Sequence, residues 1–351
     1  MGISTNDLVS LLMADAEGIC SKLDFSFLRG KTVMVAGASG LLGTHFLATL
    51  RKMAEKTGDI RTVAVMNSSP FGHIEALLDY GNSKAICGDI ADNDFLASLP
   101  QADIIIHSAG YGQPGRFMED PVNTIKVNTA GTFGFLDKLL PGGKFLFSST
   151  SELYSGLPNP PYSESQIGTT NTDHPRACYI EAKRCGEAIC NAYRMKGVEA
   201  KSVRISLAYG PGIRVGDRRA VNSFIEKALV KKEINMLDRG MASRTYCYVT
   251  DAVYMQWLIL LHGKEPVYNV GGISRMTIGE LAQKIGALTN ASVRLPDSGK
   301  TGLEGAPADV SLDMTRFEKE FHPMSYVPLD DGISRTITWL RSLLEWSAPA
   351  L

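Results

Sequence analysis

Thr32-Val-Met-Val-Ala-Gly-Ala-Ser-Gly-Leu-Leu-Gly43 is the stretch that decides the fold. Its first five residues form a short apolar run, which is typical of a buried parallel strand. The glycines that follow permit a tight turn and let backbone N–H groups at the start of a helix approach an anionic phosphate. Because the turn lies between a predicted strand and a predicted helix, it indicates dinucleotide binding rather than a plain glycine turn. The residues expected to contact the dinucleotide here are Gly37, Ser39, Gly40, Leu41, Leu42 and Gly43.

Strand-like and helix-like segments alternate after this turn. Short apolar runs predict strands over residues 62–66, 84–87, 103–107, 144–148 and 200–207. Amphipathic periodicity predicts helices over residues 41–56, 124–140 and 177–196. This alternation predicts an α/β fold with a doubly wound parallel sheet of the Rossmann type.

The pattern becomes less regular after residue 209, where helices are predicted over residues 220–231, 249–261, 278–289 and 333–344. We therefore expect three parts. Residues 1–30 form an N-terminal helical extension and residues 31–209 form the dinucleotide-binding domain. Residues 210–351 form mainly a smaller substrate-binding lobe, which returns some elements to the main sheet.

Composition excludes several classes of protein. The chain has 351 residues, 44% of them hydrophobic, and a net charge of −1, which argues against a nucleic-acid surface or a polybasic membrane anchor. The six cysteines show no Cys-x-x-Cys pair and no metal-ligand spacing, so we expect a reduced cytoplasmic setting and no metal site. We expect no targeting segment, and the longest apolar run is too short to cross a bilayer.

The second predicted strand ends without the acidic residue that commonly holds an adenosine ribose. It reads Val65-Met-Asn67-Ser68, and either Asn67 or Ser68 could bond a ribose hydroxyl. No Arg or Lys follows closely to bind a 2′-phosphate, so NAD is favoured over NADP. Asp89 and Ile90, after the next strand, could bracket the adenine, although a plain turn explains them equally well.

Tyr179 and Lys183 lie four residues apart on a predicted helix, so the phenol and the ammonium share one face. A phenol with an ordinary pKa of about 10 is a poor base at neutral pH, and a nearby positive charge lowers that pKa. The pair therefore predicts a tyrosine base assisted by a lysine.

Ser148-Ser-Thr-Ser-Glu152 follows a predicted strand, near the carboxyl edge of the sheet where ligands bind. Thr150 could bond a substrate hydroxyl and help pass its proton to Tyr179. Glu152 could act as an acid or base beside a reacting sugar, and a solvated surface glutamate is the alternative.

Arginines in the second half of the chain could bind a diphosphate through charge-assisted hydrogen bonds. Arg244 is the main candidate, with Arg204 and Arg214 as lesser ones; a surface arginine is the alternative. His107, at a strand end, is interpreted as a structural histidine.

Taken together, these motifs resemble the extended short-chain dehydrogenase/reductase family of nucleotide-sugar epimerases, dehydratases and decarboxylases. The resemblance extends over residues 31–344. It implies an NAD cofactor, a nucleotide-diphosphate sugar as substrate, and a homodimer formed through the helices near residues 125–140 and 177–196. It further implies Ser108, Ala109, Gly110, Asn128, Ser148, Tyr179, Lys183 and Leu207 as cofactor contacts, and Thr150, Glu152, Asn222 and Arg244 as substrate contacts.

Within that family, the segments 149–154 and 175–184 look most like UDP-glucuronate decarboxylases. This likeness implies that Tyr179, assisted by Thr150, deprotonates the sugar 4-hydroxyl while NAD takes the C4 hydride. Lys183 would hold the nicotinamide ribose and lower the tyrosine pKa. The resulting β-keto acid loses CO₂, and the hydride then returns to C4. Glu152 and Ser151 match active-site residues of those enzymes.

Two departures leave other reactions open. The decarboxylases usually carry an Arg-Lys-Pro-Asp-like segment, whereas this chain reads Glu304-Gly-Ala-Pro-Ala-Asp309. The 4,6-dehydratases carry Asp where this chain has Ser151. A 4-epimerase, a dehydratase and a 4-ketoreductase therefore remain alternatives, as does a non-catalytic NAD-binding scaffold or sensor.

Overall fold

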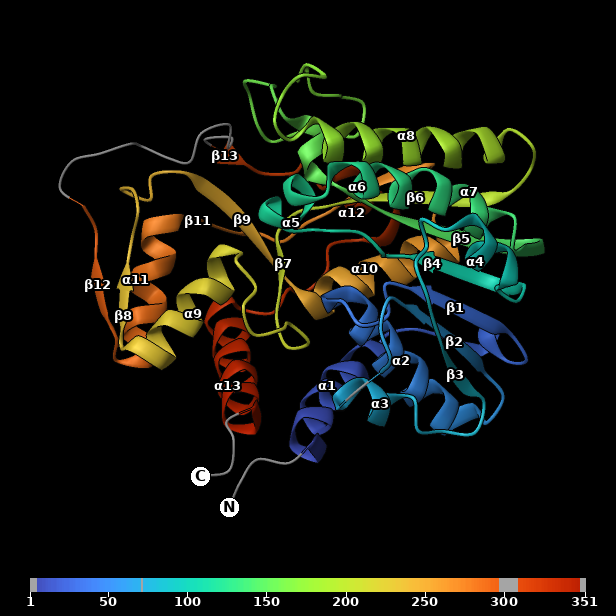
Figure 1. The fold of residues 1–351 in the computed structure, drawn as a ribbon, viewed down its shortest axis with the longest axis horizontal. Helices are drawn as coiled ribbons and strands as arrows, with labels where there is room; N and C mark the ends of the chain where they lie inside the picture. Colours follow the sequence, from blue (N-terminus) through green and yellow to red (C-terminus); the bar gives the residue numbers. More distant parts are fainter. Residues whose placement is uncertain (1–4, 71, 297–308, 348–351) are drawn as a thin grey trace.

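The computed structural model describes residues 5–70, 72–296 and 309–347. Within these ranges the largest sheet is parallel and has seven strands in the order β10-β6-β5-β4-β1-β2-β3 (Figure 1). Strand order reverses beside β1, as in a doubly wound fold, so the predicted fold class is confirmed. The strands are β1 (Thr32–Ala36), β2 (Arg61–Met66), β3 (Ser83–Cys87), β4 (Ala102–His107), β5 (Leu139–Thr150), β6 (Glu199–Ile205) and β10 (Val267–Val270).

Helices cover both faces of this sheet (Figure 1). Alternate side chains of β1 enter two separate cores, since Val33 and Val35 pack in one and Met34 and Ala36 in the other. The helices before residue 200 are α1 (Thr5–Cys20), α2 (Leu41–Thr57), α3 (His73–Leu77), α4 (Asn93–Ser98), α5 (Pro114–Glu119), α6 (Pro121–Asn128), α7 (Ala130–Leu136) and α8 (Ala177–Arg194), with the 3₁₀ turns η1 (Ser26–Leu28) and η2 (Ser151–Tyr154).

The predicted helix over residues 124–140 is wrong in two respects. It is broken at Thr129 into α6 and α7, and its last residues belong to β5, which begins at Leu139. Thr129 is β-branched, with Gly131 just after it, and both have low helix propensity. Pro141 cannot continue a helix, and Gly142 has a φ of 73°, which is not helical. Strand β5 pairs with β4 across an irregularity in register.

Many of the residues after 209 form smaller sheets and helices beside the main sheet (Figure 1), while α10 packs against β5 and β6 of that sheet. Here β9 pairs with β7, β11 and β13, while β8 pairs with β12. Only β10, among the described strands after residue 209, joins the seven-stranded sheet, where it lies next to β6. The remaining elements are β7 (Ala208–Tyr209), β8 (Glu233–Asn235), β9 (Ser243–Tyr248), β11 (Ser274–Thr277), β12 (Ser292–Arg294), β13 (Asp309–Val310), α9 (Ala220–Lys231), α10 (Val249–His262), α11 (Ile278–Thr289), α12 (Thr315–Phe321) and α13 (Leu329–Ser347).

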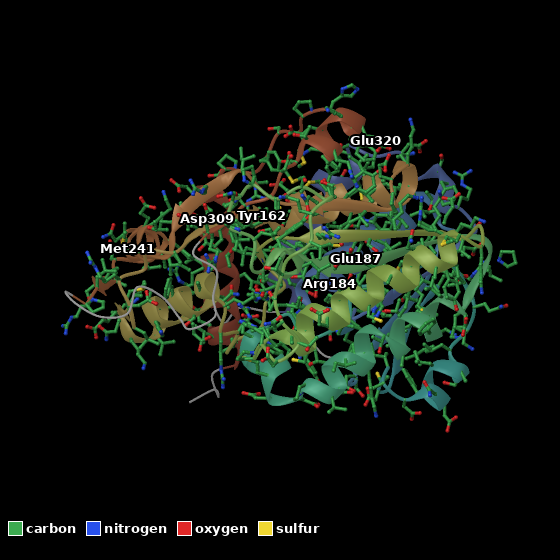
Figure 2. The ribbon with its side chains drawn as sticks, turned by 90° about the horizontal axis from the view of Figure 1, so that it is seen from above. Tyr162, Arg184, Glu187, Met241, Asp309 and Glu320 are labelled. Atoms are coloured by element: carbon green, nitrogen blue, oxygen red, sulfur yellow. The ribbon has the colours of Figure 1, made fainter. Side chains whose placement is uncertain are left out.

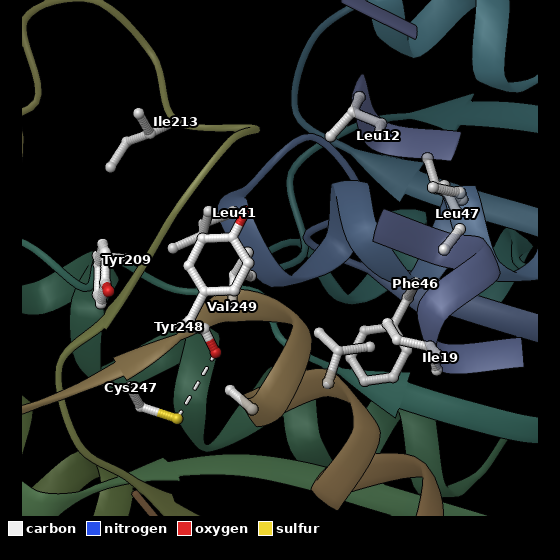
Figure 3. Packing of buried hydrophobic residues seen from close by; sticks show 14 of the residues in the cluster. Leu12, Ile19, Leu41, Phe46, Leu47, Tyr209, Ile213, Cys247, Tyr248 and Val249 are labelled. Carbon is white, nitrogen blue, oxygen red and sulfur yellow. Dashed lines mark hydrogen bonds between the residues drawn. The ribbon is translucent and has the colours of Figure 1, made fainter. Parts of the chain in front are cut away.

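The N-terminal helix α1 packs between the two parts. Its buried face, which includes Leu12 and Ile19, joins the core that also contains Phe46 of α2 (Figure 3). The buried Asp15 of α1 accepts hydrogen bonds from the Tyr248 hydroxyl of β9 at 3.0 Å and from Arg335 Nη1 of α13 at 2.9 Å. One carboxylate thus links the N-terminal helix to two elements of the C-terminal part.

Among the helices in the described ranges, none has the length and apolar character needed to cross a membrane.

Candidate active site

The glycine turn is shaped by contacts that exclude side chains. Gly37 has a φ of +76°, and a Cβ there would lie 2.7 Å from the backbone of Ala109. A Cβ on Gly43 would lie 2.7 Å from Ala38 Cα. The first N–H groups of a helix have no intrahelical partner, and at α2 the N-cap residue Gly40 provides no side chain to accept from them. The turn therefore fits the pyrophosphate of a dinucleotide cofactor.

The other predicted cofactor residues lie at neighbouring strand ends. Asn67 and Ser68 are exposed just after β2, and Asp89 is exposed just after β3, where its Oδ1 accepts from Ala91 N at 2.9 Å. Ser108 follows β4, and its hydroxyl lies 2.8 Å from that of Ser148 in β5. These positions share the carboxyl edge of the parallel sheet with the glycine turn.

Tyr179 and Lys183 share the buried face of α8, as predicted from their spacing. Lys183 Nζ donates to the Ser148 carbonyl at 2.6 Å and lies 5.9 Å from the centroid of the Tyr179 ring. The Tyr179 hydroxyl is hydrogen-bonded to Thr150. Strand β5 and helix α8 therefore bring the predicted base, its hydroxyl partner and the lysine together.

Burial dominates the electrostatics of this pair. It raises the pKa of Tyr179 to about 12, and the hydrogen bond to Thr150 acts in the opposite direction. Burial also lowers the pKa of Lys183 to about 7. The sequence predicts a lowered pKa for Tyr179, whereas the structure gives a raised one. The reason is that desolvation of the phenolate outweighs the contacts that favour it.

Gly110 and Asn128 lie beside the lysine. A Cβ on Gly110 would be 3.4 Å from Asn128 Oδ1 and 3.7 Å from Lys183 Nζ. Asn128 is buried, and its Oδ1 has no hydrogen-bond partner within the described residues. A buried acceptor of this kind is suited to a ligand or a water molecule.

Glu152 lies in η2, directly after Thr150, and its N–H donates to Thr150 Oγ1 at 3.2 Å. Its Oε1 accepts from Arg176 Nη2 at 2.8 Å. Burial raises the pKa of the Glu152 carboxyl, while Arg176, Arg244 and His174 lower it. Glu152 is therefore a largely buried carboxyl rather than a solvated surface glutamate.

Arg244 in β9 belongs to the same cluster. Its Nη1 donates to the Ser243 carbonyl at 2.7 Å. Burial lowers the pKa of this guanidinium, whereas Glu152 is among the groups that raise it. The second part of the chain thus contributes a positive charge to the site around Glu152.

The remaining predicted residues are less closely tied to this cluster. Asn222 of α9 is buried with an Oδ1 that has no partner in the described ranges. Leu207, just after β6, has a φ of 35°, and its carbonyl accepts from Cys247 N at 3.3 Å. Ser151 lies between Thr150 and Glu152 in η2.

The lesser arginine candidates and His107 have separate positions. Arg204 is buried in an ion pair with Glu187, so its expected role at a diphosphate is not supported. Arg214 Nη2 donates to the carbonyl of Ser39 in the glycine turn at 3.3 Å. Burial lowers the pKa of His107 to about 3, and its Nε2 lies 3.3 Å from the Val127 carbonyl, as expected of a structural histidine.

Two residues at the site were given no role in the sequence analysis. The ring of Phe117, from α5, stacks on that of Tyr179 with a centroid distance of 4.5 Å and an interplanar angle of 2°. Arg176 Cζ lies 5.6 Å from the centroid of the Phe117 ring. The position of Arg176, three residues before Tyr179, was the available signal.

No group of three or more potential His, Cys, Asp or Glu metal ligands occurs in the part of the chain that the structure describes. The segment 304–308, where the decarboxylase-like arginine was expected and is missing, lies outside the described residues.

Residues 33–271 match the sequence profile of the NAD dependent epimerase/dehydratase family. The chain belongs to this family. It is therefore an NAD-dependent enzyme of the epimerase/dehydratase type, as the resemblance implied. The glycine turn, the buried Tyr179 and Lys183, and the unpartnered Asn128 Oδ1 are consistent with that cofactor.

Relatives of the chain include UDP-glucuronic acid decarboxylases. A UDP-glucuronic acid decarboxylase 1 from Xenopus tropicalis is 28% identical over 323 residues, which is 91% of this chain and 74% of that protein. A UDP-glucuronic acid decarboxylase 3 from Arabidopsis thaliana is 30% identical over 268 residues, covering 75% of this chain and 76% of that protein.

Solved structures show the same fold. A dTDP-glucose 4,6-dehydratase from Streptomyces venezuelae, solved with NAD bound, is 23% identical with a TM-score of 0.77, covering 91% of this chain and 99% of the other. A UDP-glucose 4-epimerase from Thermotoga maritima is 24% identical with a TM-score of 0.75, covering 89% and 99%.

Proposed function

We propose that this enzyme decarboxylates a nucleotide-diphosphate uronic acid, with UDP-glucuronate as the leading candidate, through transient oxidation at C4. The observation that carries the proposal is the buried Glu152 beside Thr150 and Tyr179, with Arg176 and Arg244 acting on it. Arg176 and Arg244 both carry guanidinium groups, which bind carboxylates and phosphates by charge-assisted hydrogen bonds, so the surroundings of Glu152 suit an anionic substrate. The curated decarboxylases to which the chain is similar support this reaction over others in the family.

In the proposed reaction, the NAD cofactor supplies hydride acceptance and return. Tyr179 takes the proton of the 4-hydroxyl, and Thr150, already bonded to the phenol, orients that hydroxyl. Oxidation at C4 places a ketone β to the carboxylate. The bond between C5 and the carboxyl carbon then breaks, CO₂ leaves, and the electron pair forms an enolate. Arg244 would hold the anionic substrate. The enolate takes a proton at C5, which Glu152 would donate, and the C4 ketone then accepts the returning hydride and recovers its proton from Tyr179.

A panel of UDP-, GDP-, CDP- and dTDP-sugars, each followed by product mass, tests this function. We expect UDP-glucuronate to lose the mass of carbon dioxide. Loss of water would instead indicate a dehydratase, and unchanged mass with altered stereochemistry an epimerase. Purified protein that retains NAD but changes no sugar would favour the sensor alternative. The Tyr179→Phe variant is the matched control, since it should keep NAD and lose turnover.

We also propose a homodimer, a cytoplasmic location and the division of the chain near residue 209. For the dimer, the support is a set of exposed apolar side chains on α6 and α7, which pack beside α8: Val122, Ile125 and Phe133. Phe133→Glu should shift the protein toward monomer in analytical ultracentrifugation. A monomeric wild-type protein would contradict the dimer. Cell fractionation tests the location.

A further inference from the structure

We infer that Arg176 is a positioning residue that aims the Glu152 carboxyl at the reacting sugar and sets its protonation state. The side chain lies just before α8, three residues before Tyr179, and its Nη2 donates to Glu152 Oε1 at 2.8 Å. Both side chains are largely buried, with exposed fractions of 13% for Arg176 and 22% for Glu152. The atoms of this contact do not include those of Tyr179, Thr150 or Lys183.

A ring stack fixes the arginine relative to the base. The Phe117 ring lies parallel to the Tyr179 ring, and the Arg176 guanidinium carbon lies 5.6 Å from the Phe117 centroid. The phenol, the phenyl ring, the guanidinium and the carboxyl therefore form one connected set. Movement of Arg176 would displace Glu152 relative to Tyr179.

The pair has hydrogen-bonding capacity that the protein leaves unused. Glu152 Oε2 and Arg176 Nε are both buried, and neither has a partner within the described residues. Glu152 also lines a small cavity of about 20 Å³ together with Ser151 and Val310. Arg184 Nε and Glu181 Oε1 are likewise buried without a partner in the described residues, so the unused atoms of Arg176 and Glu152 point to a ligand because of their place beside Thr150 and Tyr179. One acceptor and one donor remain for a polar ligand such as a sugar.

Several charged and titratable groups act on the Glu152 carboxyl. Arg176, Arg244 and His174 favour its ionised form, and Tyr179 titrates beside it. Of these three groups, Arg176 lowers the pKa of Glu152 most, so its removal raises that pKa further. Whether the reaction requires Glu152 ionised or protonated, the limb of the pH–rate profile that reports it then moves to higher pH.

The test compares Arg176→Met, Arg176→Lys, Glu152→Gln and the double variant Arg176→Met/Glu152→Gln in the full-length, NAD-loaded protein. The assay follows consumption of whichever nucleotide sugar the panel identifies. The part played by Glu152 rests on the proposed function, but a different reaction product would leave this test intact. Arg184→Met is the matched control, because Arg184, which Figure 2 labels, also pairs with a glutamate on α8, Glu181, at 3.2 Å, and has no part in the proposed reaction.

We expect Arg176→Met to lower kcat by up to about 100-fold, with a smaller change in KM, through displacement of Glu152. The pH limb that Glu152→Gln abolishes should move to higher pH. Arg176→Lys, which keeps the charge, should recover part of the rate and of the limb position, and it provides the readout if the methionine variant does not fold. In the Glu152→Gln background, Arg176→Met should have little further effect.

Equal losses from Arg176→Met with and without Glu152 would overturn the inference, because Arg176 would then act independently of the carboxyl. An unshifted limb in both Arg176 variants would also overturn it. The alternative is that the pH limb reports His174 rather than Glu152, and the His174→Gln variant tests this. If the limb is lost in His174→Gln and kept in Glu152→Gln, the assignment to Glu152 is wrong.

Discussion

Two Arg–Glu ion pairs lie near the end of β5, and they differ in how many hydrogen bonds surround them. In the first, Arg204 Nε and Nη2 both donate to Glu187, at 3.0 and 2.8 Å, and Ser149 Oγ donates to the same carboxylate at 2.6 Å. In the second, Arg176 makes one hydrogen bond to Glu152, and each side chain keeps a buried atom without a partner in the described residues.

The two pairs differ in how completely the protein satisfies their hydrogen-bonding atoms. Around Glu187 the acceptors are used within the protein, and Arg204 Nη1 also donates to the Tyr154 hydroxyl at 3.0 Å, so the network fixes β5, β6 and α8 together. Around Glu152 one buried donor and one buried acceptor have no partner within the described residues. A buried charge with complete hydrogen bonding rigidifies a core, whereas incomplete bonding is tolerated where binding completes it.

The largest effect on stability is expected at the first pair. Arg204→Met leaves the Glu187 carboxylate buried without its counter-charge, which should lower the free energy of unfolding by about 3–5 kcal/mol. Denaturant unfolding followed by circular dichroism measures this. Arg184→Met makes the same substitution in the pair that Arg184 forms with Glu181 and should change the free energy of unfolding by less than about 1 kcal/mol. Equal losses in the two variants would remove the contrast between a buried pair and a partly exposed one.

At the second pair the expected loss is in turnover instead. Glu152→Gln keeps the size of the side chain but removes proton exchange, which commonly contributes about 10²–10⁴-fold to a rate. Steady-state kinetics, together with an unfolding curve close to that of the wild type, would support the comparison. A variant that unfolds readily and keeps a normal turnover per folded molecule would mean that Glu152 is structural.

A smaller effect is expected at Ser149. Ser149→Ala removes one hydrogen bond to the charged Glu187, which should cost about 1.5–3 kcal/mol of unfolding free energy. Denaturant unfolding measures this free energy. Ser151→Ala serves as the control because Ser151 lies beside Glu152 rather than Glu187. If Ser149→Ala left stability unchanged, the Glu187 network would be less cooperative than its geometry indicates.

The smallest effect is a pH dependence of stability. Burial raises the pKa of Glu152 in the folded protein above its ordinary value of 4.5. Between the pKa of the unfolded chain and that of the folded protein, the folded protein therefore binds more protons. The free energy of unfolding therefore falls as pH rises through that window. Glu152→Gln should lose this part of the slope when unfolding is measured from pH 4 upward. An unchanged slope would indicate that another group titrates there.

Much of the fold could be predicted from the sequence, because its signals are local. The strand Thr32–Ala36 and the helices Ala220–Lys231 and Ile278–Thr289 have the predicted bounds. The start of α11 also carries a capping box between Thr277 and Glu280. Regular periodicity and turn residues determine such elements without reference to the rest of the chain.

Features that depend on tertiary contacts could not be predicted in this way. Phe117 lies on a helix of six residues, and its stacking on Tyr179 depends on how α5 packs against α8. The predicted direction of the Tyr179 pKa shift was wrong, because the sequence shows the neighbours of Tyr179 along the helix but not its burial. The hydrogen bond from Arg176 to Glu152 joins two segments 24 residues apart, beyond the range of a periodic pattern.

The contact between Asp15 and Arg335 has a consequence for how the protein is made. These residues are 320 positions apart in the chain, and synthesis proceeds at roughly 5–20 residues per second. After α1 leaves the ribosome, tens of seconds therefore pass before its partner on α13 exists, at roughly that rate. During this interval the Asp15 carboxylate and the apolar face of α1 depend on other contacts, such as those to α2, so completion of the fold follows emergence of the last helix.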